Sequence, residues 1–295
     1  MWGRQVEFPV GDGVLAGLDF GGRGAGVLLV HGSGHNAAVW TDVASHLVDH
    51  CHPVAVDLRG HGHSLLASST PERYWRDLGD VVAALGWERP VLVGHSTGGY
   101  AVTAAAAAGL VDAAALCVVD GLVLDDRDTA ALSQAQWQGP DAAERLREMF
   151  RYGWRADEQQ MHAYVEECVD ASGTDWLNAG ARPELVREVM RRSFLRRADG
   201  LGERRPTIEE IATVSAPDPH AAIYPSVDVY AHVECPITYV LPDRGFYAQR
   251  RAEVQALADA SPDRELVEVA ANHNVPMTRP AETAAVIVEL VRRRP

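Results

Sequence analysis

A serine that could act as a nucleophile, Ser96, lies at the centre of a Gly-x-Ser-x-Gly pentapeptide at residues 94–98. The apolar residues 91–93 before it predict a strand, and the small residues Gly99, Ala101 and 104–108 after it predict the start of a helix. A serine at such a sharp strand-to-helix corner projects its hydroxyl above the end of the sheet, and the flanking glycines leave room for the turn. The backbone N–H of Thr97 then points to where an oxyanion would form.

A serine hydroxyl is a weak nucleophile near neutral pH and needs a base to activate it. All 27 basic residues are arginine, and the absence of lysine excludes a Ser–Lys dyad, a Schiff base and a phosphate-loop lysine. We therefore predict that the base is His273, in the loop after the last expected strand, residues 266–269. Loops that leave the carboxyl ends of parallel strands share one edge of the sheet, so His273 and Ser96 can meet there.

The elements that must position these residues alternate along the chain. Residues 4–10 and 14–20 predict a hairpin that turns at residues 11–13. Apolar runs and amphipathic stretches then alternate, which indicates an α/β fold with a mostly parallel sheet covered on both faces. The expected strands of this sheet are residues 27–30, 53–56, 91–93, 114–119, 236–241 and 266–269, and the expected helices are residues 37–48, 74–85, 99–108, 249–258 and 281–292.

This alternation stops after the sixth strand and resumes near residue 234. Residues 121–233 carry tryptophans and other apolar residues at helix-like spacings, which predicts a helical insertion. We therefore expect a core domain of residues 1–120 and 234–295, with residues 121–233 inserted into it. Aromatic residues of the insertion either form its own core or line a substrate pocket.

Three motifs in this order resemble those of the α/β-hydrolase superfamily. His31-Gly32-Ser33-Gly34 resembles the oxyanion loop of that family, residues 57–64 (Asp-Leu-Arg-Gly-His-Gly-His-Ser) are similar to its D-x-R-G-H-G-x-S segment, and residues 94–98 resemble its nucleophile elbow. The resemblance implies a doubly wound sheet in which Ser33 and Thr97 supply the oxyanion N–H groups, and it makes residues 121–233 a cap (lid) over the site. It also implies that Asp57, His61 and His63 are structural.

The acid of a Ser-His-Asp triad is where the sequence departs from that family. The family places a carboxylate a few residues after the strand at 236–241, in a G-x-x-D pattern, whereas this chain has Pro242-Asp243-Arg244-Gly245. Asp243 therefore stands about two residues early. The other candidate is Asp120, at the end of the preceding strand, a position that some members of the superfamily use. We favour Asp120 and keep Asp243 as the alternative.

Composition limits the partners and the compartment. The formal net charge of −14 disfavours binding to nucleic acid or to an anionic membrane. There is no apolar run of 18 residues, no export signal at the start and no C-x-x-C spacing among the four cysteines, so we expect a soluble cytoplasmic protein. Ligand spacings typical of zinc and the G-x-G-x-x-G motif are also missing, so we expect no metal and no cofactor.

The predicted function is that of a serine hydrolase which cleaves an ester, thioester or lactone of a small to medium organic molecule through an acyl-enzyme. Alternatives are a C–C bond hydrolase or another cofactor-free enzyme of this fold, and, in a different class, a non-catalytic ligand receptor on the same scaffold. The substrate would bind under the cap. Residues 182–205 hold eight arginines and four acids, so this segment is either a solvated helix face or a docking patch for an anionic substrate or a carrier-bound acyl group. The role of His35 is open.

Overall fold

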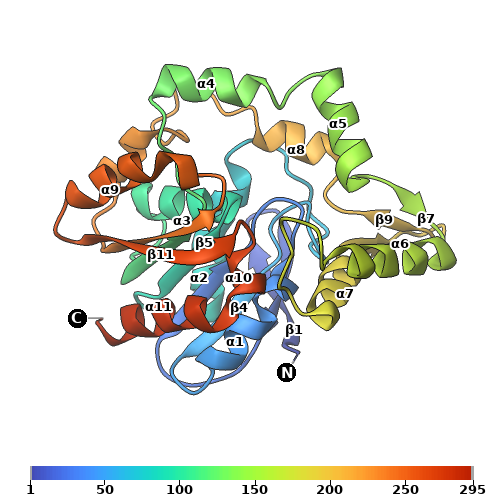
Figure 1. Ribbon diagram of the computed structural model, residues 1–295, viewed down its shortest axis with the longest axis horizontal. Coiled ribbons are helices and arrows are strands. Elements are labelled where there is room, and N and C mark those ends of the chain that lie inside the picture. Colours follow the sequence, from blue (N-terminus) through green and yellow to red (C-terminus); the bar gives the residue numbers. More distant parts are fainter. Residues whose placement is uncertain (1, 294–295) are drawn as a thin grey trace.

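The computed structural model describes residues 2–293, which form a central sheet of eight strands in the order β1-β2-β4-β3-β5-β6-β10-β11 (Figure 1). These strands are β1 (Arg4–Val10), β2 (Gly13–Asp19), β3 (Gly26–Val30), β4 (His52–Val56), β5 (Val91–His95), β6 (Ala115–Val119), β10 (Ile237–Arg244) and β11 (Arg264–Asn272). β1 and β2 form the predicted hairpin, and β2 pairs antiparallel with β4. The other neighbours are parallel, so the predicted mostly parallel sheet is confirmed.

Helices cover both faces of this sheet, because successive strand residues point to opposite sides. Leu28 and Leu92 pack with the helices on one face, whereas Val27 and Val91 pack with those on the other. The first face carries α2 (Arg73–Leu85), α3 (Thr97–Ala107) and α9 (Arg251–Asp259), with η3 (Ala248–Arg250) leading into α9. The second carries η1 (Ala37–Trp40), α1 (Thr41–Leu47), α10 (Val275–Thr278) and α11 (Pro280–Arg292).

Between β6 and β10 the chain leaves the sheet and forms a separate set of elements, which we call the cap segment (residues 121–233). Its elements are α4 (Arg127–Ala135), α5 (Pro140–Phe150), β7 (Arg155–Ala156), α6 (Glu158–Ala171), α7 (Pro183–Arg192), β8 (Phe194–Arg196), β9 (Gly202–Arg204), α8 (Ile208–Val214) and η2 (Val227–His232). In Figure 1, α4, α5 and α8 lie above the sheet and α6 and α7 lie to its right. The division into two domains stays a prediction.

The insertion predicted to be helical consists mostly of helices but also contains three short strands that the sequence did not predict. β7, β9 and β8 form a small antiparallel sheet inside the cap segment. Strands of two or three residues are too short to show the alternation of apolar and polar side chains that reveals a longer strand. They form because their backbone groups pair with one another across the segment.

Buried contacts attach α7 to the core. Leu185 and Val189 belong to the same apolar cluster as η1, α1 and α11. The guanidinium of Arg192, at the end of α7, pairs with the carboxylate of Asp57 at 2.8 Å, and both side chains are at most 5% exposed. The side-chain amide of Asn36 also donates to the carbonyl of Val189 at 2.8 Å. One side of α7 is therefore buried against the core.

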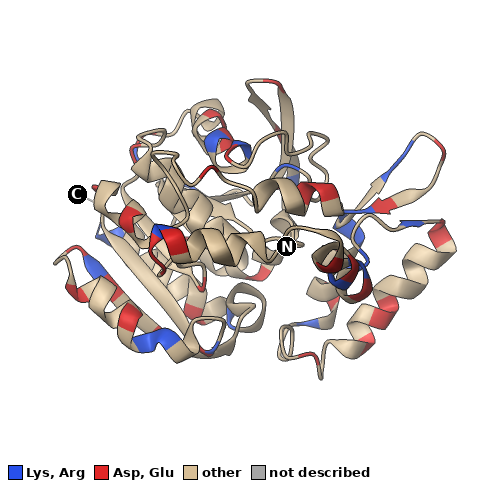
Figure 2. Ribbon diagram, turned by 90° about the horizontal axis from the view of Figure 1, so that it is seen from above, with Lys and Arg blue, Asp and Glu red and all other residues tan. Residues whose placement is uncertain are grey.

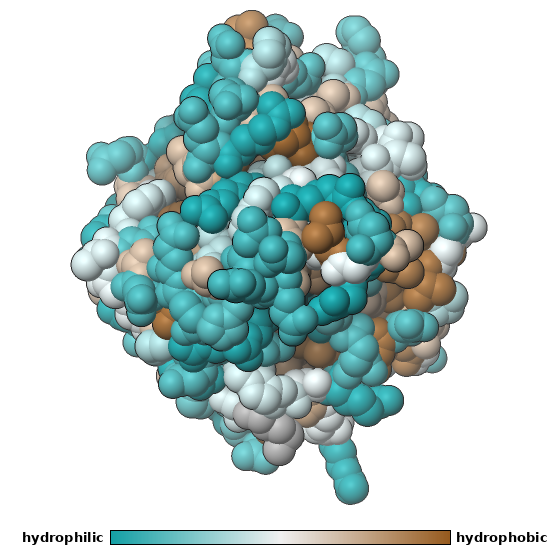
Figure 3. All heavy atoms as spheres, turned by 90° about the vertical axis from the view of Figure 1, so that its right-hand side faces the viewer, coloured by the Kyte–Doolittle hydropathy of each residue, from teal (hydrophilic) through white to brown (hydrophobic). Residues whose placement is uncertain are grey.

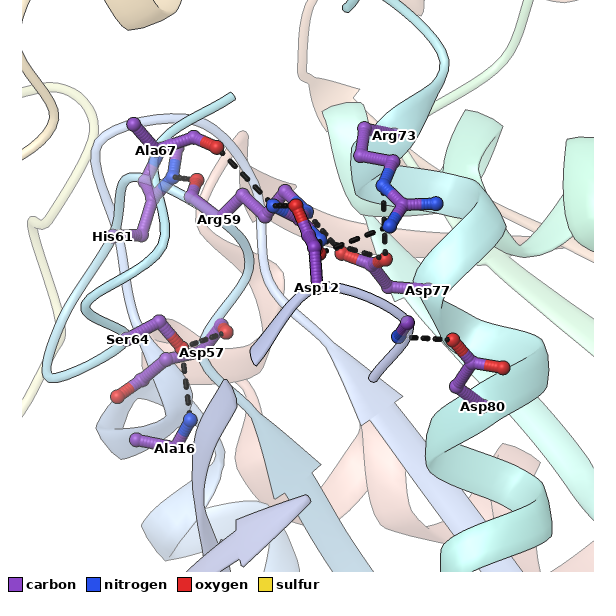
Figure 4. A network of polar contacts seen from close by, with 11 residues as sticks. Asp12, Ala16, Asp57, Arg59, His61, Ser64, Ala67, Arg73, Asp77 and Asp80 are labelled. Atoms are coloured by element: carbon purple, nitrogen blue, oxygen red, sulfur yellow. Dashed lines mark hydrogen bonds and ion pairs between the residues drawn. The ribbon is translucent and has the colours of Figure 1, made fainter. Parts of the chain in front are cut away.

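A second polar network holds the segment after β4 against the first hairpin (Figure 4). The guanidinium of Arg59 binds the carboxylates of Asp12, in the hairpin turn, and Asp77, on α2. The hydrogen bond from Arg59 lowers the pKa of Asp12 to about 2, whereas burial raises the pKa of Asp77. Ser64 donates to the carbonyl of Asp57 at 2.6 Å and thereby closes the loop.

The surface combines charges of both signs. Basic and acidic residues are interspersed over both parts of the molecule (Figure 2), and the face that carries α6 and α7 is largely hydrophilic (Figure 3). Among the residues that the structure describes, no helix is both long enough and apolar enough to cross a membrane.

Candidate active site

Ser96 lies at the corner between β5 and α3, as the pentapeptide predicts. Its backbone has φ = 53° and ψ = −125°, a strained conformation for a residue with a side chain. A Cβ at Gly98 would lie 2.4 Å from the carbonyl oxygen of Val30, so only glycine lets the helix start so close to β3. The tight packing of this turn therefore forces the Ser96 side chain out of the sheet.

His273 directly follows β11, and the structure brings it into contact with Asp120, which directly follows β6. The Nδ1 atom of His273 and the Oδ2 atom of Asp120 are 2.6 Å apart, although 153 residues separate them in sequence. The side chains are 7% and 0% exposed. A buried carboxylate at this distance fixes the tautomer of the imidazole, because Nδ1 must carry the proton that the carboxylate accepts.

The loop after β10 is built around Asp120. The backbone N–H of Phe246 donates to Oδ2 of Asp120 at 2.9 Å. A Cβ at Gly245 would lie 2.3 Å from the same oxygen, so the glycine at the position where the related family carries its carboxylate makes room for the carboxylate of Asp120. Asp243 instead accepts from the backbone N–H of Ala271 at 2.9 Å, and its side chain is 50% exposed.

Ser33 and Thr97 flank the space beside Ser96. Ser33 belongs to the loop between β3 and η1, and Thr97 is the first residue of α3. Their hydroxyl oxygens are 2.9 Å apart. Within residues 2–293, the backbone N–H groups of both residues have no backbone acceptor. Two free N–H groups, one of them at a helix N-terminus, are the donors that an oxyanion requires.

His95 packs beside His273, and His35 packs on the ring of His95. The ring of His95 is 4.6 Å from the ring of His273 and 6.0 Å from that of His35, measured between centroids. Nε2 of His95 donates to the backbone carbonyl of His273 at 2.9 Å. Burial holds the pKa of His95 well below its usual value and lowers that of His35 to about 3, so both rings are neutral. His95 thus positions the backbone of His273.

A cavity of about 710 Å³ opens over these residues. Ser96, His273, Asp120, Ser33 and Thr97 all line it. The cap segment supplies much of the opposite wall, including the aromatic residues Trp137, Phe150, Tyr152, Tyr164 and Trp176. A large pocket with apolar walls and a few polar groups is typical of a site for a small organic molecule.

The predicted structural residues hold the loops around this cavity. Asp57 accepts from the backbone N–H groups of Ala37 at 2.7 Å and His63 at 2.9 Å. His61 donates from Nδ1 to the carbonyl of Arg59 at 2.7 Å. None of Asp57, His61 and His63 lines the cavity. In the described part of the chain, no group of three or more His, Cys, Asp or Glu side chains is arranged to hold a metal ion.

Four residues at the cavity were not found from the sequence: His95, Phe246, Tyr152 and Arg204. The ring of Phe246 lies 4.0 Å from the ring of His273, between centroids. His95 could have been found, because it directly precedes Ser96 in the pentapeptide. The positions of the other three depend on how the loop after β10 and the cap segment fold over the sheet, although Arg204 belongs to the arginine-rich segment 182–205 that the sequence analysis noted.

Comparison with known proteins agrees with this architecture. Residues 27–286 match the model of the "Alpha/beta hydrolase family". Protein phosphatase methylesterase 1 of Mus musculus is 35% identical over 125 residues, which cover 39% of this chain and 32% of that protein. The chain thus aligns with about a third of the length of this curated relative.

Solved structures with the same fold are more distant in sequence. E-2-(acetamidomethylene)succinate hydrolase superposes with a TM-score of 0.74 at 20% identity over 99% of this chain and 100% of that one. The enol-lactonase from Burkholderia xenovorans LB400 superposes with a TM-score of 0.67 at 17% identity over 98% and 100%. Because the family model matches residues 27–286, which is most of the sequence, the chain belongs to the alpha/beta hydrolase family.

Proposed function

We propose that this protein is a serine hydrolase that cleaves an ester, thioester or lactone of a small to medium organic molecule. The observation that carries the proposal is the 2.6 Å hydrogen bond between His273 and the buried Asp120, in the wall of the cavity that Ser96 also lines. The methylesterase and lactonase names among the similar proteins support cleavage of an acyl–oxygen bond.

In the proposed mechanism Oγ of Ser96 attacks the acyl carbon of the substrate while Nε2 of His273 takes the hydroxyl proton. Asp120 holds the Nδ1 proton and stabilises the imidazolium that forms. The N–H groups of Ser33 and Thr97 bind the oxyanion of the tetrahedral intermediate. His273 then gives its proton to the leaving group, and a water molecule, activated by the same histidine, hydrolyses the acyl-enzyme and regenerates Ser96.

The first test is a Ser96→Ala variant. In this mechanism Ser96 is the nucleophile, and its removal leaves no hydroxyl to form the acyl-enzyme. Hydrolysis of aryl esters should therefore fall by about 10³-fold or more. Covalent labelling by a fluorophosphonate probe, read by intact-protein mass spectrometry, should disappear. Ser215 also lines the cavity but has no role in the mechanism, so Ser215→Ala should keep both the labelling and the rate.

Two outcomes would contradict the proposal. Failure of the unsubstituted protein both to react with the probe and to hydrolyse any acyl substrate would favour a ligand receptor. A Ser96→Ala variant that turns over its substrate at nearly the original rate would exclude the acyl-enzyme.

A further inference from the structure

A buried arginine in the wall of the cavity has no carboxylate partner. Arg204, the last residue of β9, is 4% exposed and lines the cavity together with Ser96. Its Nη1 donates to the carbonyl of Arg205 at 2.6 Å, while its Nε is buried without any partner. Within residues 2–293, its guanidinium takes part in no ion pair with an acid. A desolvated cation without a counter-ion is costly, so the folded protein holds it there at the expense of stability.

Most of the other arginines of residues 182–205 differ from Arg204 because they pair with a carboxylate. Arg205 is equally buried, but the carboxylate of Glu210 binds it at 2.7 Å. Most of the remaining arginines also have carboxylate partners: Arg182 with Asp42, Arg187 with Glu166, Arg192 with Asp57, Arg196 with Glu158 and Arg197 with Glu203. Most charges of this segment therefore already have a partner within the protein, and the docking patch for an anionic substrate or a carrier-bound acyl group stays a prediction. Two arginines of this segment have no such ion pair among the described residues: Arg191 is exposed, whereas Arg204 is buried and lines the cavity.

The acidic residues that line the cavity do not pair with the guanidinium of Arg204, because each already has another partner. Asp120 binds His273, and Glu72 pairs with Arg76 at 2.8 Å. Asp175 accepts from the backbone N–H of Leu177 at 3.0 Å. Among the described residues, no acidic side chain of the cavity is therefore left to pair with Arg204.

Tyr152 connects Arg204 to the oxyanion loop. The guanidinium carbon of Arg204 lies 5.7 Å from the centroid of the Tyr152 ring. The hydroxyl oxygen of Tyr152 touches Gly34, next to Ser33: a Cβ on that glycine would be 1.9 Å from it. Burial raises the pKa of Tyr152 to about 12, so its hydroxyl stays protonated and can donate a hydrogen bond. One aromatic side chain therefore separates the cation from the oxyanion loop.

We propose that Arg204 and Tyr152 bind a carboxylate of the substrate, so that the acyl compound cleaved at Ser96 carries a second, free carboxyl group. This inference rests on the proposed hydrolase function and deepens it. A planar carboxylate fits a single guanidinium through paired hydrogen bonds. A cavity of about 710 Å³ accommodates a monoester of a small dicarboxylic acid.

The first test compares two esters of equal length, p-nitrophenyl hydrogen adipate and p-nitrophenyl hexanoate, after subtraction of their spontaneous hydrolysis. The unsubstituted enzyme should prefer the anionic ester. In Arg204→Gln the ratio of kcat/KM for the anionic ester to that for the neutral ester should fall by about 10- to 100-fold, as expected when a hydrogen bond to a charged group is lost. Arg204→Lys, which keeps the charge but not the planar fork, should lose less of this preference.

The matched control is Arg155→Gln. Arg155 lies on β7, which pairs with β9, but it is exposed, binds Asp199 and does not line the cavity. This change removes the same charge from the same small sheet, so it should leave the ratio unaltered. An equal fall in Arg155→Gln, or an unchanged ratio in Arg204→Gln with a native circular-dichroism spectrum, would overturn the proposal.

A second measurement separates this inference from the proposed function. Binding of adipate to Ser96→Ala, followed by titration calorimetry, needs no turnover. The dissociation constant should rise at least tenfold when Arg204→Gln is added and should not change when Arg155→Gln is added. Absence of adipate binding up to millimolar concentration would overturn the carboxylate site even where ester hydrolysis supports the hydrolase. If adipate binding depends on Arg204 but the protein cleaves no ester, the carboxylate site would be supported and the proposed hydrolase reaction would be contradicted.

Discussion

At the scale of single residues, the two candidate aspartates differ in what they contact. Asp120 accepts from His273 and from the backbone N–H of Phe246, and its Oδ1 atom is buried without a partner in the described chain. This carboxylate is therefore poised to stabilise a positive charge on His273. Asp243 accepts a hydrogen bond from the backbone N–H of Ala271 and is half exposed, so its negative charge is solvated.

We predict that Asp120→Asn reduces kcat by up to about 10⁴-fold, because an amide at this place stabilises the wrong tautomer of His273 and cannot balance the imidazolium. Asp243→Asn should change kcat by less than tenfold, since its side-chain oxygen can still accept from Ala271. Steady-state kinetics on one ester, with thermal unfolding to verify folding, measures both. A greater loss at Asp243 would mean that the acid has been assigned to the wrong strand.

At the scale of elements, two ion pairs join the cap segment to the core and differ in burial. Arg192, at the end of α7, binds Asp57, and both side chains are at most 5% exposed. Arg182, just before α7, binds Asp42 of α1 with exposures of 45% and 19%. Asp57 also binds the backbone N–H of Ala37, at the start of η1. The buried pair therefore ties the cap segment to the end of the oxyanion loop.

We predict that Asp57→Asn lowers the free energy of unfolding by about 3–5 kcal/mol, because it leaves the cation of Arg192 buried without its counter-ion. Asp42→Asn, at the exposed pair, should cost less than about 1 kcal/mol. Urea unfolding followed by circular dichroism compares the two variants directly. Equal losses would show that burial does not decide the strength of these contacts.

At the scale of the whole molecule, four histidines make stability depend on pH: three are buried and His35 is half-buried. Burial lowers the pKa of His31 to about 4 and of His35 to about 3, and it holds those of His61 and His95 well below the usual value near 6.5. These rings lie around the cavity and the loops that line it. They stay neutral in the folded protein at pH values where the unfolded chain already takes up protons.

Because the unfolded state binds more protons than the folded state between pH 6.5 and 4, the free energy of unfolding should fall as the pH is lowered through this range. The expected slope is up to about 1.4 kcal/mol per pH unit for each of these histidines. Urea unfolding at pH 7.5, 6.5 and 5.5 measures it. His35→Gln should reduce the slope, whereas His46→Gln, at an exposed position on α1, should not. A constant free energy between pH 7.5 and 5.5 would contradict the assignment.

Local patterns in the sequence were enough to predict the succession of the main strands and helices along the chain and the corner at Ser96. An apolar run, a Gly-x-Ser-x-Gly turn and a run of small residues act within a few residues of one another, so their geometry depends little on the rest of the chain. The place of His273 after the last strand could be predicted for the same reason. The longer elements were found, whereas the small sheet β7-β9-β8 and the short helix α10 were missed.

Only the tertiary structure decided which carboxylate meets His273 and which arginine faces the cavity. Asp120 and His273 are 153 residues apart in sequence, and their contact depends on the side-by-side packing of β6, β10 and β11 and on the space that Gly245 leaves. Arg204 and Arg205 are neighbours with the same chemistry, yet one is neutralised by Glu210 and the other is not. Residue type alone does not decide such differences, because the energy of a buried charge depends on what the fold places around it.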